Sequence, residues 1–214
     1  MARVPAEART NAIAVAGDVT EAASRERAIA AAVREFGGLD CLVNNAGVGA
    51  QGRFVDAEPE RARRIFEVNF FALVEMTRAA LPQLRAGRDA LVVNVGSILG
   101  HRGIPYSSEY CASKFAVRGF SEALRAELLR EKIDVLLVSP GTTESEFFER
   151  LIEAGEKPPW PEQPPVPAEV VARRIVRAME RRRHEIIPNA RGRMMVWLNR
   201  LAPRVVDAWM GRYG

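Results

Sequence analysis

The chain has 214 residues, of which 48% are hydrophobic and 27% are charged, and its formal net charge is +4. A chain of this length suffices for one compact domain, and this balance is not that of a disordered or low-complexity protein. The first residues contain no apolar core of a signal peptide, and no apolar run reaches the roughly 18 residues that span a bilayer. We therefore expect a cytoplasmic protein.

Cysteine and histidine are too sparse for a disulfide framework or a metal centre. Cys41 lies in an apolar strand pattern and Cys111 on a predicted helix, which indicates a reduced compartment. His101 and His184 lie far apart, without cysteine or carboxylate partners at ligand spacing. We expect no metal, and we expect both histidines to be solvated or capping.

The charge is concentrated at the C-terminal end. From Arg173 to Gly214, eleven arginines stand against three acidic residues, a net +8, so the rest of the chain carries −4. A solvated basic face is the favoured interpretation. Because no aromatic-studded strand or zinc-ligand spacing accompanies the arginines, we expect no nucleic-acid partner.

The first half of the chain alternates between strand and helix patterns. Residues 12–16 form a short apolar run that predicts a strand, and Thr20 is expected to cap a helix over residues 21–36. Gly37 and Gly38 end that helix. A buried strand over 39–45, a glycine-rich loop over 46–57 and a helix from Pro59 to about Leu84 follow.

The second half continues the alternation. The pattern predicts strands over 90–95, 134–139 and 185–187, and helices over 107–131 and 168–182. A proline-rich loop over 158–167 precedes the last of these helices, and an amphipathic segment bent at Pro203 runs from Arg191 onwards.

Apolar strands that alternate with long helices indicate the α/β class: a doubly wound, Rossmann-like parallel sheet with helices on both faces and right-handed crossovers. Ligands of such sheets bind beyond the carboxyl ends of the strands. Polar or turn-forming residues stand at four of these ends, namely Asp18, Asn45, Ser97 and the pair Pro140 and Gly141.

Tyr110 and Lys114 stand four residues apart on one predicted helix, so their side chains share a face. A neighbouring ammonium favours the phenolate form of a tyrosine, and lowering its pKa from about 10 to about 7 takes about 4 kcal/mol. Ser97 follows a strand and is placed to donate a hydrogen bond to a substrate oxygen. By itself such a tyrosine and lysine pair is usually a solvated pair.

Four segments in order resemble the short-chain dehydrogenase/reductase family. They are the sequence NNAG at 44–47 after a strand, Asn69 in the next helix, Ser97 thirteen residues before the sequence YCASK at 110–114, and Pro140 with Gly141 after a further strand. The resemblance covers residues 11–187. It implies an NAD(P)-dependent oxidoreductase that interconverts an alcohol and a carbonyl.

The resemblance also implies roles for single residues. Tyr110 would be the general acid/base, Lys114 would tune it and hold the nicotinamide ribose, and Ser97 would orient the substrate. Asn69 would hold a water that relays protons. The residues implied to contact the cofactor are Asp18, Val19, Asn45, Ala46, Gly47, Tyr110, Lys114, Pro140, Gly141 and Thr143.

The family's first unit, a strand, a glycine-rich turn with its helix and a second strand, is absent, so we expect an N-terminally truncated form of the fold. That unit carries the residue that distinguishes NAD from NADP, so the choice of cofactor is open. Gly47 to Gly52 satisfies G-x-G-x-x-G, but no helix opens at its third glycine, and we interpret it as a loop. Either strand 12–16 pairs with strand 39–45, or an inner sheet edge stays unpaired.

We expect a Rossmann-like domain over 1–190, with a substrate loop or lid at 142–167, and a basic amphipathic helical tail over 191–214. The tail is expected to pack against the domain or a partner subunit, with peripheral membrane contact as the alternative. A homo-oligomer and a bulky apolar alcohol or ketone substrate are expected. The rival to an oxidoreductase is a non-catalytic relic that serves as a binding or dimerisation module through helices 59–84 and 107–131.

Overall fold

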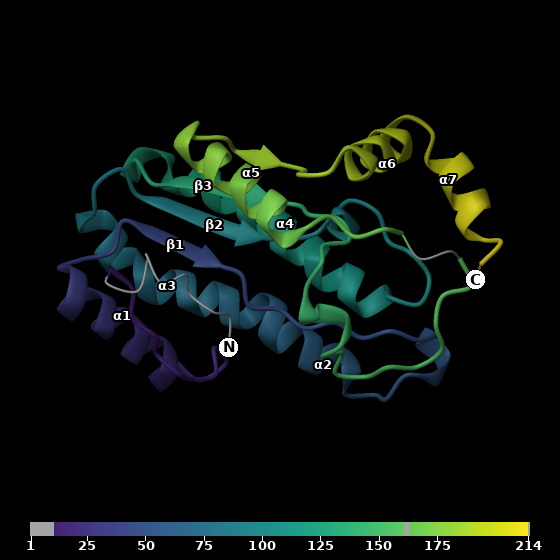
Figure 1. Ribbon diagram of the computed structural model, residues 1–214, viewed down its shortest axis with the longest axis horizontal. Helices are drawn as coiled ribbons and strands as arrows, with labels where there is room; N and C mark the ends of the chain where they lie inside the picture. The colour runs from purple at the N-terminus through teal and green to yellow at the C-terminus, as the bar shows by residue number, and fades with distance from the viewer. Residues whose placement is uncertain (1–10, 161–162, 214) are drawn as a thin grey trace.

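The computed structural model describes residues 11–160 and 163–213, and its centre is a parallel sheet of four strands in the order β1-β2-β3-β4 (Figure 1). The strands are β1 (Cys41–Asn44), β2 (Leu91–Val95), β3 (Asp134–Val138) and β4 (Glu185–Ile186). The alternation of apolar runs with helices thus correctly predicted a Rossmann-like α/β fold. The predicted positions of these four strands agree with the observed ones to within two residues at each end.

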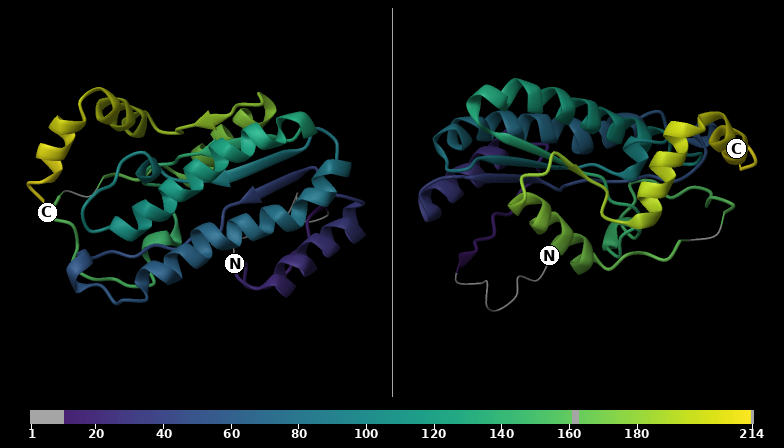
Figure 2. Two further views of the ribbon diagram at one scale, coloured as in Figure 1. Left: turned by 180° about the vertical axis from the view of Figure 1, so that it is seen from behind. Right: turned by 90° about the horizontal axis from the view of Figure 1, so that it is seen from above.

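Helices cover both faces of the sheet, as Figure 2 shows. Val92 and Val135 point to one face, where they pack against α3 (Ala72–Ala86) and α4 (Ser108–Leu128). Their strand neighbours, among them Val93 and Leu136, point to the other face and pack against α5 (Ala168–Glu180). Because side chains alternate along a strand, buried strands of this kind are apolar throughout. The helix α1 (Ala22–Phe36) lies beside α3.

The prediction that all crossovers are right-handed is wrong for this sheet. All four strands are parallel and their order advances in one direction, yet the connections through α3 and α4 run over one face and the connection through α5 over the other. Two such connections on opposite faces must have opposite hands. The long segment between β3 and α5, which includes residues 142–167, gives this connection the length to cross to the other face.

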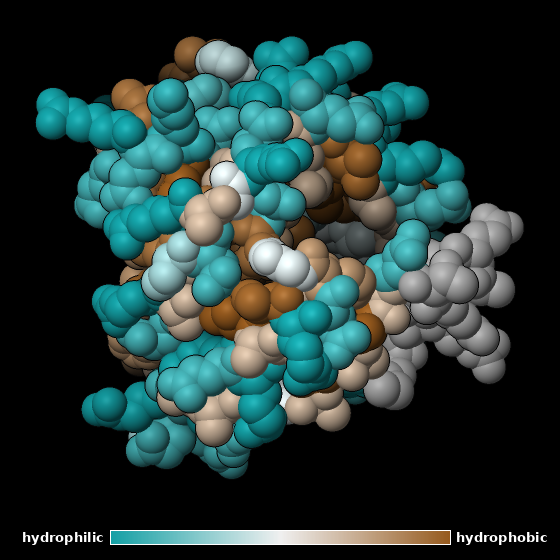
Figure 3. Space-filling view, turned by 90° about the vertical axis from the view of Figure 1, so that its left-hand side faces the viewer, coloured by the Kyte–Doolittle hydropathy of each residue, from teal (hydrophilic) through white to brown (hydrophobic). Residues whose placement is uncertain are grey.

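The predicted strand at residues 12–16 is also wrong. This segment forms no strand, and Ile13 and Val15 are 44% and 41% exposed. Among the described residues β1 therefore has no strand partner on its outer side, and Val43 is 49% exposed. Figure 3 views the molecule from the left-hand side of Figure 1, onto the amino ends of the strands rather than the outer edge of β1, and shows brown apolar surface in the middle of that end. Of the two predicted outcomes for this edge, the structure has the unpaired one.

The predicted helix from Pro59 to Leu84 is divided by an irregular turn. The segment consists of α2 (Arg61–Phe66), a π-helical turn (Glu67–Phe71) and α3. A π-turn inserts one residue into the helical repeat and turns the side chains that follow, and such turns are frequent at functional sites. Asn69 lies in this turn and is 1% exposed.

The chain ends in two short helices, α6 (Ala190–Leu201) and α7 (Pro203–Met210), which form the bend predicted at Pro203. Short 3-10 turns occupy Phe54–Asp56, Ile98–Gly100, Leu129–Glu131 and Glu146–Phe148. The predicted cap at Thr20 is wrong, because Thr20 bonds to Asp18 and Glu21 is the N-cap residue of α1. Within the described ranges, no helix is long and apolar enough to cross a membrane.

Candidate active site

The predicted site residues gather at the carboxyl ends of three neighbouring strands. Asn45 to Gly47 follow β1, Ser97 follows β2, and Pro140 to Thr143 follow β3. The first turns of α4 bring Tyr110 and Lys114 to the same edge. Carboxyl ends of parallel strands form the ligand-binding crevice of α/β sheets, so this edge is the candidate site.

Ser97 and Tyr110 form the first contact of the site. Ser97 is 8% exposed, and its hydroxyl accepts a hydrogen bond from the Leu99 amide at 3.1 Å, which holds the side chain at the start of the 3-10 turn. The Ser97 side chain lies near enough to the Tyr110 hydroxyl to act on its pKa as a hydrogen-bond partner. The two hydroxyls therefore lie close enough to bind the same substrate oxygen.

Tyr110 and Lys114 are one helical turn apart, and the Lys114 ammonium lies 5.7 Å from the centre of the Tyr110 ring. Burial raises the pKa of Tyr110 to about 12, although the hydrogen bond with Ser97 acts to lower it. Burial lowers the pKa of Lys114 to about 8. The expectation that the lysine brings the tyrosine pKa down towards 7 is therefore not met in the chain by itself, because desolvation disfavours the charged form of both groups.

Lys114 connects the helix to the strand ends. Its ammonium donates a hydrogen bond to the Val95 carbonyl at 3.0 Å, and the residue is 5% exposed. A Cβ atom on Gly47 would lie 3.6 Å from this ammonium and 3.3 Å from Asn69 Oδ1. Gly47, Asn69 and Lys114 thus lie next to one another.

Asn69 is held by three hydrogen bonds. Its Oδ1 accepts from the Val48 amide at 2.8 Å, and its Nδ2 donates to the Val48 carbonyl and to Ser113 Oγ, both at 3.0 Å. Ser113 in turn donates to the Tyr110 carbonyl at 2.7 Å. Ser113 was not predicted as a site residue, and a serine within a helix gives no signal in the sequence that it connects the π-turn to α4.

Phe147 is a second residue that the sequence analysis missed. Its ring lies 5.6 Å from the Tyr110 ring, at 60° between the planes, and it stands in the predicted substrate loop. The loop is paired with the glycine-rich segment after β1: the Gln51 amide donates to the Glu153 carbonyl at 3.0 Å, and the Ile152 amide donates to the Gly49 carbonyl at 2.9 Å. The loop thus covers the tyrosine with an aromatic side chain.

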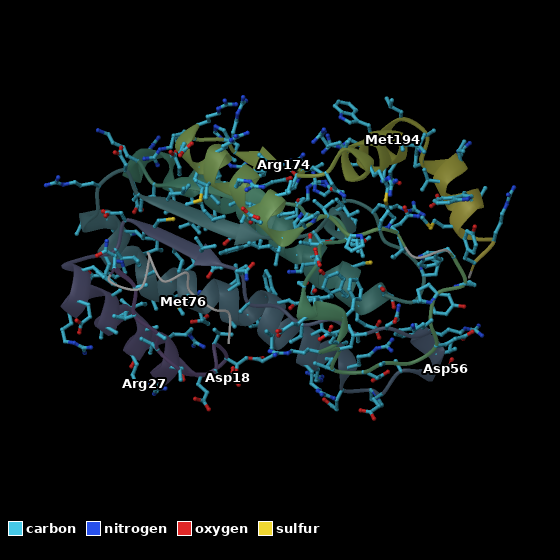
Figure 4. All side chains as sticks on the ribbon, viewed as in Figure 1. Asp18, Arg27, Asp56, Met76, Arg174 and Met194 are labelled. Carbon is cyan, nitrogen blue, oxygen red and sulfur yellow. The ribbon has the colours of Figure 1, made fainter. Side chains whose placement is uncertain are left out.

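The remaining predicted cofactor residues divide into two groups. Pro140 lies against the turn that follows Ser97, because its carbonyl accepts from the Ile98 amide at 2.9 Å, and the carbonyl of the next residue, Gly141, accepts from Thr143 Oγ1 at 3.0 Å. Asp18, which lies beside the start of α1 (Figure 4), accepts two hydrogen bonds from Thr20 at 2.8 Å. These bonds lower the pKa of Asp18, the larger effect being that of the Thr20 amide. Val19 accepts from Arg25 at 2.8 Å. The Asp18 carboxylate and the Val19 carbonyl are therefore both engaged in hydrogen bonds with residues that lie close by in the sequence.

The histidine prediction is wrong for His101. This residue is 6% exposed, and its Nε2 lies 3.0 Å from both Ser139 Oγ and Glu185 Oε1. It therefore joins β3 to β4 instead of facing solvent, whereas His184 is exposed as predicted. In the part of the chain that the structure describes, no group of three histidine, cysteine or carboxylate side chains is arranged to bind a metal.

Two curated relatives are similar to this chain in sequence. A relative from Bacteroides thetaiotaomicron, named 3-ketodihydrosphingosine reductase, is 42% identical over 130 residues, which are 61% of this chain and 48% of that protein. An uncharacterised oxidoreductase of Bacillus subtilis, YxnA, is 32% identical over 204 residues, which are 94% of this chain and 57% of that protein. The chain thus spans about half the length of these curated relatives.

Solved structures share the fold. A short-chain dehydrogenase from Burkholderia cenocepacia in complex with NADP is 26% identical and superposes with a TM-score of 0.78, covering 92% of this chain and 77% of that one. A short-chain dehydrogenase/reductase from Burkholderia phymatum in complex with NAD is similar in fold, with a TM-score of 0.79 at 24% identity over 90% of this chain and 76% of that one. The family profile described as short chain dehydrogenase matches residues 1–155. The chain belongs to the short-chain dehydrogenase family.

Proposed function

We propose that the protein is an NAD(P)-dependent oxidoreductase that interconverts an alcohol and a carbonyl, with Tyr110 as the general acid/base. One observation carries the proposal. The neighbouring hydroxyls of Ser97 and Tyr110 lie at the carboxyl edge of the sheet, with the Lys114 ammonium 5.7 Å from the tyrosine ring. Family membership supports the same chemistry.

Proton transfer in this site would run through the two hydroxyls. In the reducing direction Ser97 and Tyr110 would both donate hydrogen bonds to the carbonyl oxygen, and Tyr110 would transfer its proton to that oxygen. Because burial raises the pKa of Tyr110 to about 12, the tyrosine starts in the acid form at neutral pH. The charged Lys114 would then stabilise the phenolate that forms.

The residues after the strands fit a nicotinamide nucleotide. Asn45 to Gly47 are exposed at the end of β1, and Gly47 has no side chain to fill the space beside Lys114 and Asn69. Lys114, Pro140, Gly141 and Thr143 would hold the nicotinamide end from the other side. When bound, the nucleotide supplies or accepts the hydride. Neighbours in complex with NADP and with NAD leave the choice between them open.

The substrate would be a bulky apolar alcohol or ketone. Phe147 and Phe148 lie on the loop over the site, with their rings 5.4 Å apart, and Phe147 contacts Tyr110. Leu151 is close enough to meet a Cβ atom on Gly49 at 3.1 Å. An apolar lining of this kind gains affinity by removing apolar surface from water.

Two measurements test the proposal in sequence. The 214-residue chain is titrated with NADPH and with NADH while the fluorescence of the reduced nicotinamide is followed, and saturation below about 1 mM, where binding is worth about 4 kcal/mol, is expected for at least one of them. Oxidation of the bound nucleotide is then followed on a panel of apolar ketones. No binding of either nucleotide at millimolar concentration contradicts the proposal for this chain.

The matched control separates binding from chemistry. Tyr110→Phe removes only the hydroxyl, so nucleotide binding is expected to persist while turnover is lost. Binding with no turnover in both the natural chain and Tyr110→Phe would support the rival function, a non-catalytic binding module. The intact contacts of Ser97, Tyr110, Lys114 and Asn69 favour the enzyme.

A further inference from the structure

The helix α6 has two apolar faces, and only one of them is covered. Gly192 and Val196 are buried against the domain. On the outer side four large apolar residues repeat at the spacing i, i+3, i+4 and i+7, which places them in one stripe along the helix. They are Met194, Trp197, Leu198 and Leu201, which are 68%, 57%, 49% and 79% exposed.

The helix α7 repeats this division. Val206 and Met210 are buried, whereas Val205 and Trp209, four residues apart, are 62% and 50% exposed. Figure 1 shows α6 and α7 as consecutive yellow helices that project at one corner of the molecule, and Met194 is labelled on α6 in Figure 4. The predicted packing of the tail on the domain thus accounts for its inner face alone. We call the six exposed apolar residues of α6 and α7 the C-terminal surface.

Positive charge surrounds the C-terminal surface. From Ala190 onwards the chain carries five arginines and one acidic residue, Asp207, and Asp207 is paired with Arg102 at 2.6 Å. The five arginines are Arg191, Arg193, Arg200, Arg204 and Arg212, and all five are exposed.

The arginines adjoin the aromatic residues of this surface directly. The Arg200 guanidinium lies 5.8 Å from the centre of the Trp197 ring. A shallow, open hollow on α7 has Arg204 and Arg212 in its lining, with Val205, Ala208 and Trp209 as the other lining residues. Cationic groups beside an apolar floor fit a molecule with an anionic head and an apolar tail.

Charge decides between the possible occupants. A second copy of the chain placed on this surface by two-fold symmetry would bring two sets of arginines together, and like charges repel. A layer of anionic phospholipid offers phosphates to the arginines and acyl chains to the tryptophan, leucine and methionine side chains. Tryptophan and arginine are residues that lie at the boundary between headgroups and acyl chains. We infer that the C-terminal surface docks the protein on an anionic lipid surface, with α6 and α7 lying flat on it.

A lipid layer bound at the C-terminal surface would lie next to the loop that covers the site. The Trp160 ring is 5.6 Å from the Tyr213 ring and 5.9 Å from the Tyr106 ring, and Tyr213 is 6.0 Å from Trp209. A continuous row of aromatic contacts therefore runs from α7 to the substrate loop and the segment before α4. Neither these contacts nor the docking depends on the reaction proposed above.

Flotation with lipid vesicles tests the inference on the 214-residue chain. The protein is mixed with vesicles of phosphatidylcholine alone, or with about one third phosphatidylglycerol, at about 0.1 M and about 0.5 M NaCl, since salt shortens the range of charge attraction. We expect flotation with the anionic vesicles at the lower salt, and at least about a 10-fold lower bound fraction on neutral vesicles or at the higher salt.

Paired variants identify the surface. We expect Trp197→Ala with Leu201→Ala to lower the bound fraction at least about 10-fold, because it removes apolar side chains from the surface. We expect a loss of at least about the same size from Arg200→Glu with Arg204→Glu, because each basic residue near an anionic membrane is worth about 1 kcal/mol. The matched controls are Phe54→Ala with Val55→Ala, which are 70% and 75% exposed, and Arg63→Glu with Arg64→Glu on α2. All the replaced side chains are exposed, and thermal unfolding checks that each variant is folded.

Three outcomes overturn the inference. One is the absence of flotation with anionic vesicles by the folded chain. Another is an equal loss in the control variants, which places binding elsewhere. The third is a dimer in light scattering that Trp197→Ala with Leu201→Ala dissociates while vesicle binding is absent, which assigns the surface to a second copy of the chain.

Discussion

Arg61 donates hydrogen bonds to both carboxylate oxygens of Glu109, the residue directly before Tyr110. The Nη2 atom lies 2.8 Å from one oxygen and 3.0 Å from the other, and Nε lies 3.0 Å from the first. Its remaining nitrogen, Nη1, donates to Glu153 in the loop over residues 142–167 at 2.8 Å. One guanidinium, 2% exposed, thus holds the helix that carries the tyrosine and the loop that covers it.

Replacing Arg61 is expected to destabilise the fold. Arg61→Met leaves Glu109 as a buried carboxylate without its cation, and the free energy of unfolding should fall by about 3–5 kcal/mol. Urea unfolding measures the change. Arg63→Met is the control, because Arg63 is exposed and its pairing with Glu60 spans 3.9 Å, so its effect should stay within about 0.5 kcal/mol. Equal effects of the two variants would contradict a buried pair.

The pairing of Arg61 with Glu109 also predicts how the free energy of unfolding depends on pH. Burial by itself raises the pKa of Glu109, but hydrogen bonds from Ser108, its own backbone and Arg61 outweigh it, so the folded pKa lies below the ordinary value. A carboxyl group with a lowered folded pKa contributes stability above its unfolded pKa and loses it as the pH falls through the folded pKa. In Glu109→Gln, unfolding free energies between pH 6 and pH 3 should therefore depend less on pH than in the natural chain. An unchanged slope would show that other carboxylates carry the acid sensitivity.

We expect Lys114 to lower the free energy of unfolding although turnover requires it. Burial lowers its pKa to about 8, so the folded state disfavours the ammonium, and stability from this group rises as the pH goes from about 8 towards the unfolded value. Lys114→Met should raise the free energy of unfolding at pH 7 by about 1–3 kcal/mol and abolish turnover. Denaturant unfolding and nucleotide oxidation measure the two effects. Lys132→Met, at an exposed position, should change neither.

The hydroxyls of Tyr110 and Ser97 can be tested separately, each by its own variant. Tyr110→Phe should lower kcat by about 10²–10⁴-fold, the range of general acid catalysis, with nucleotide affinity unchanged. Ser97→Ala should lower kcat by less than this, because Tyr110 keeps its proton. Since the pKa of Tyr110 is about 12, the rate of carbonyl reduction should not fall through loss of the tyrosine proton between pH 6 and pH 8. A titration of the rate in this range that Tyr110→Phe removes would contradict the assignment.

Gly49 and Phe147 predict how the loop meets the site. A Cβ atom on Gly49 would lie 2.6 and 2.8 Å from ring atoms of Phe147, so Gly49→Ala must displace that ring from Tyr110. We expect kcat/KM for apolar ketones to fall about 10-fold or more, since a displacement of about 1 Å in a site has effects of this order or larger. Phe147→Ala should remove the clash, so adding Gly49→Ala to it should cost little further. Additive losses in the double variant would show that the two residues act independently.

Several features of the fold and site could be predicted from the sequence because they depend on local patterns. The apolar runs at β2 and β3 and the helical period of α4 identify these elements without knowledge of their neighbours. The four-residue spacing of Tyr110 and Lys114 places both on one face of α4, and the structure has them there. Gly47 and Ser97 follow strands, so the parallel order of the sheet brings them to one edge.

Other features depend on contacts between distant parts of the chain. Arg61 meets Glu109 across 48 positions and Glu153 across 92. Residues 12–16 have the composition of a strand, but no described strand pairs with them, and a strand forms only with a hydrogen-bonded partner. The pKa of Tyr110 rises where the lysine alone predicted a fall, because burial depends on everything that packs around the ring. The local sequence thus determined which groups take part, whereas pairing, burial and the contact of Phe147 with Tyr110 were decided by the tertiary structure, since each depends on a neighbour far away along the chain.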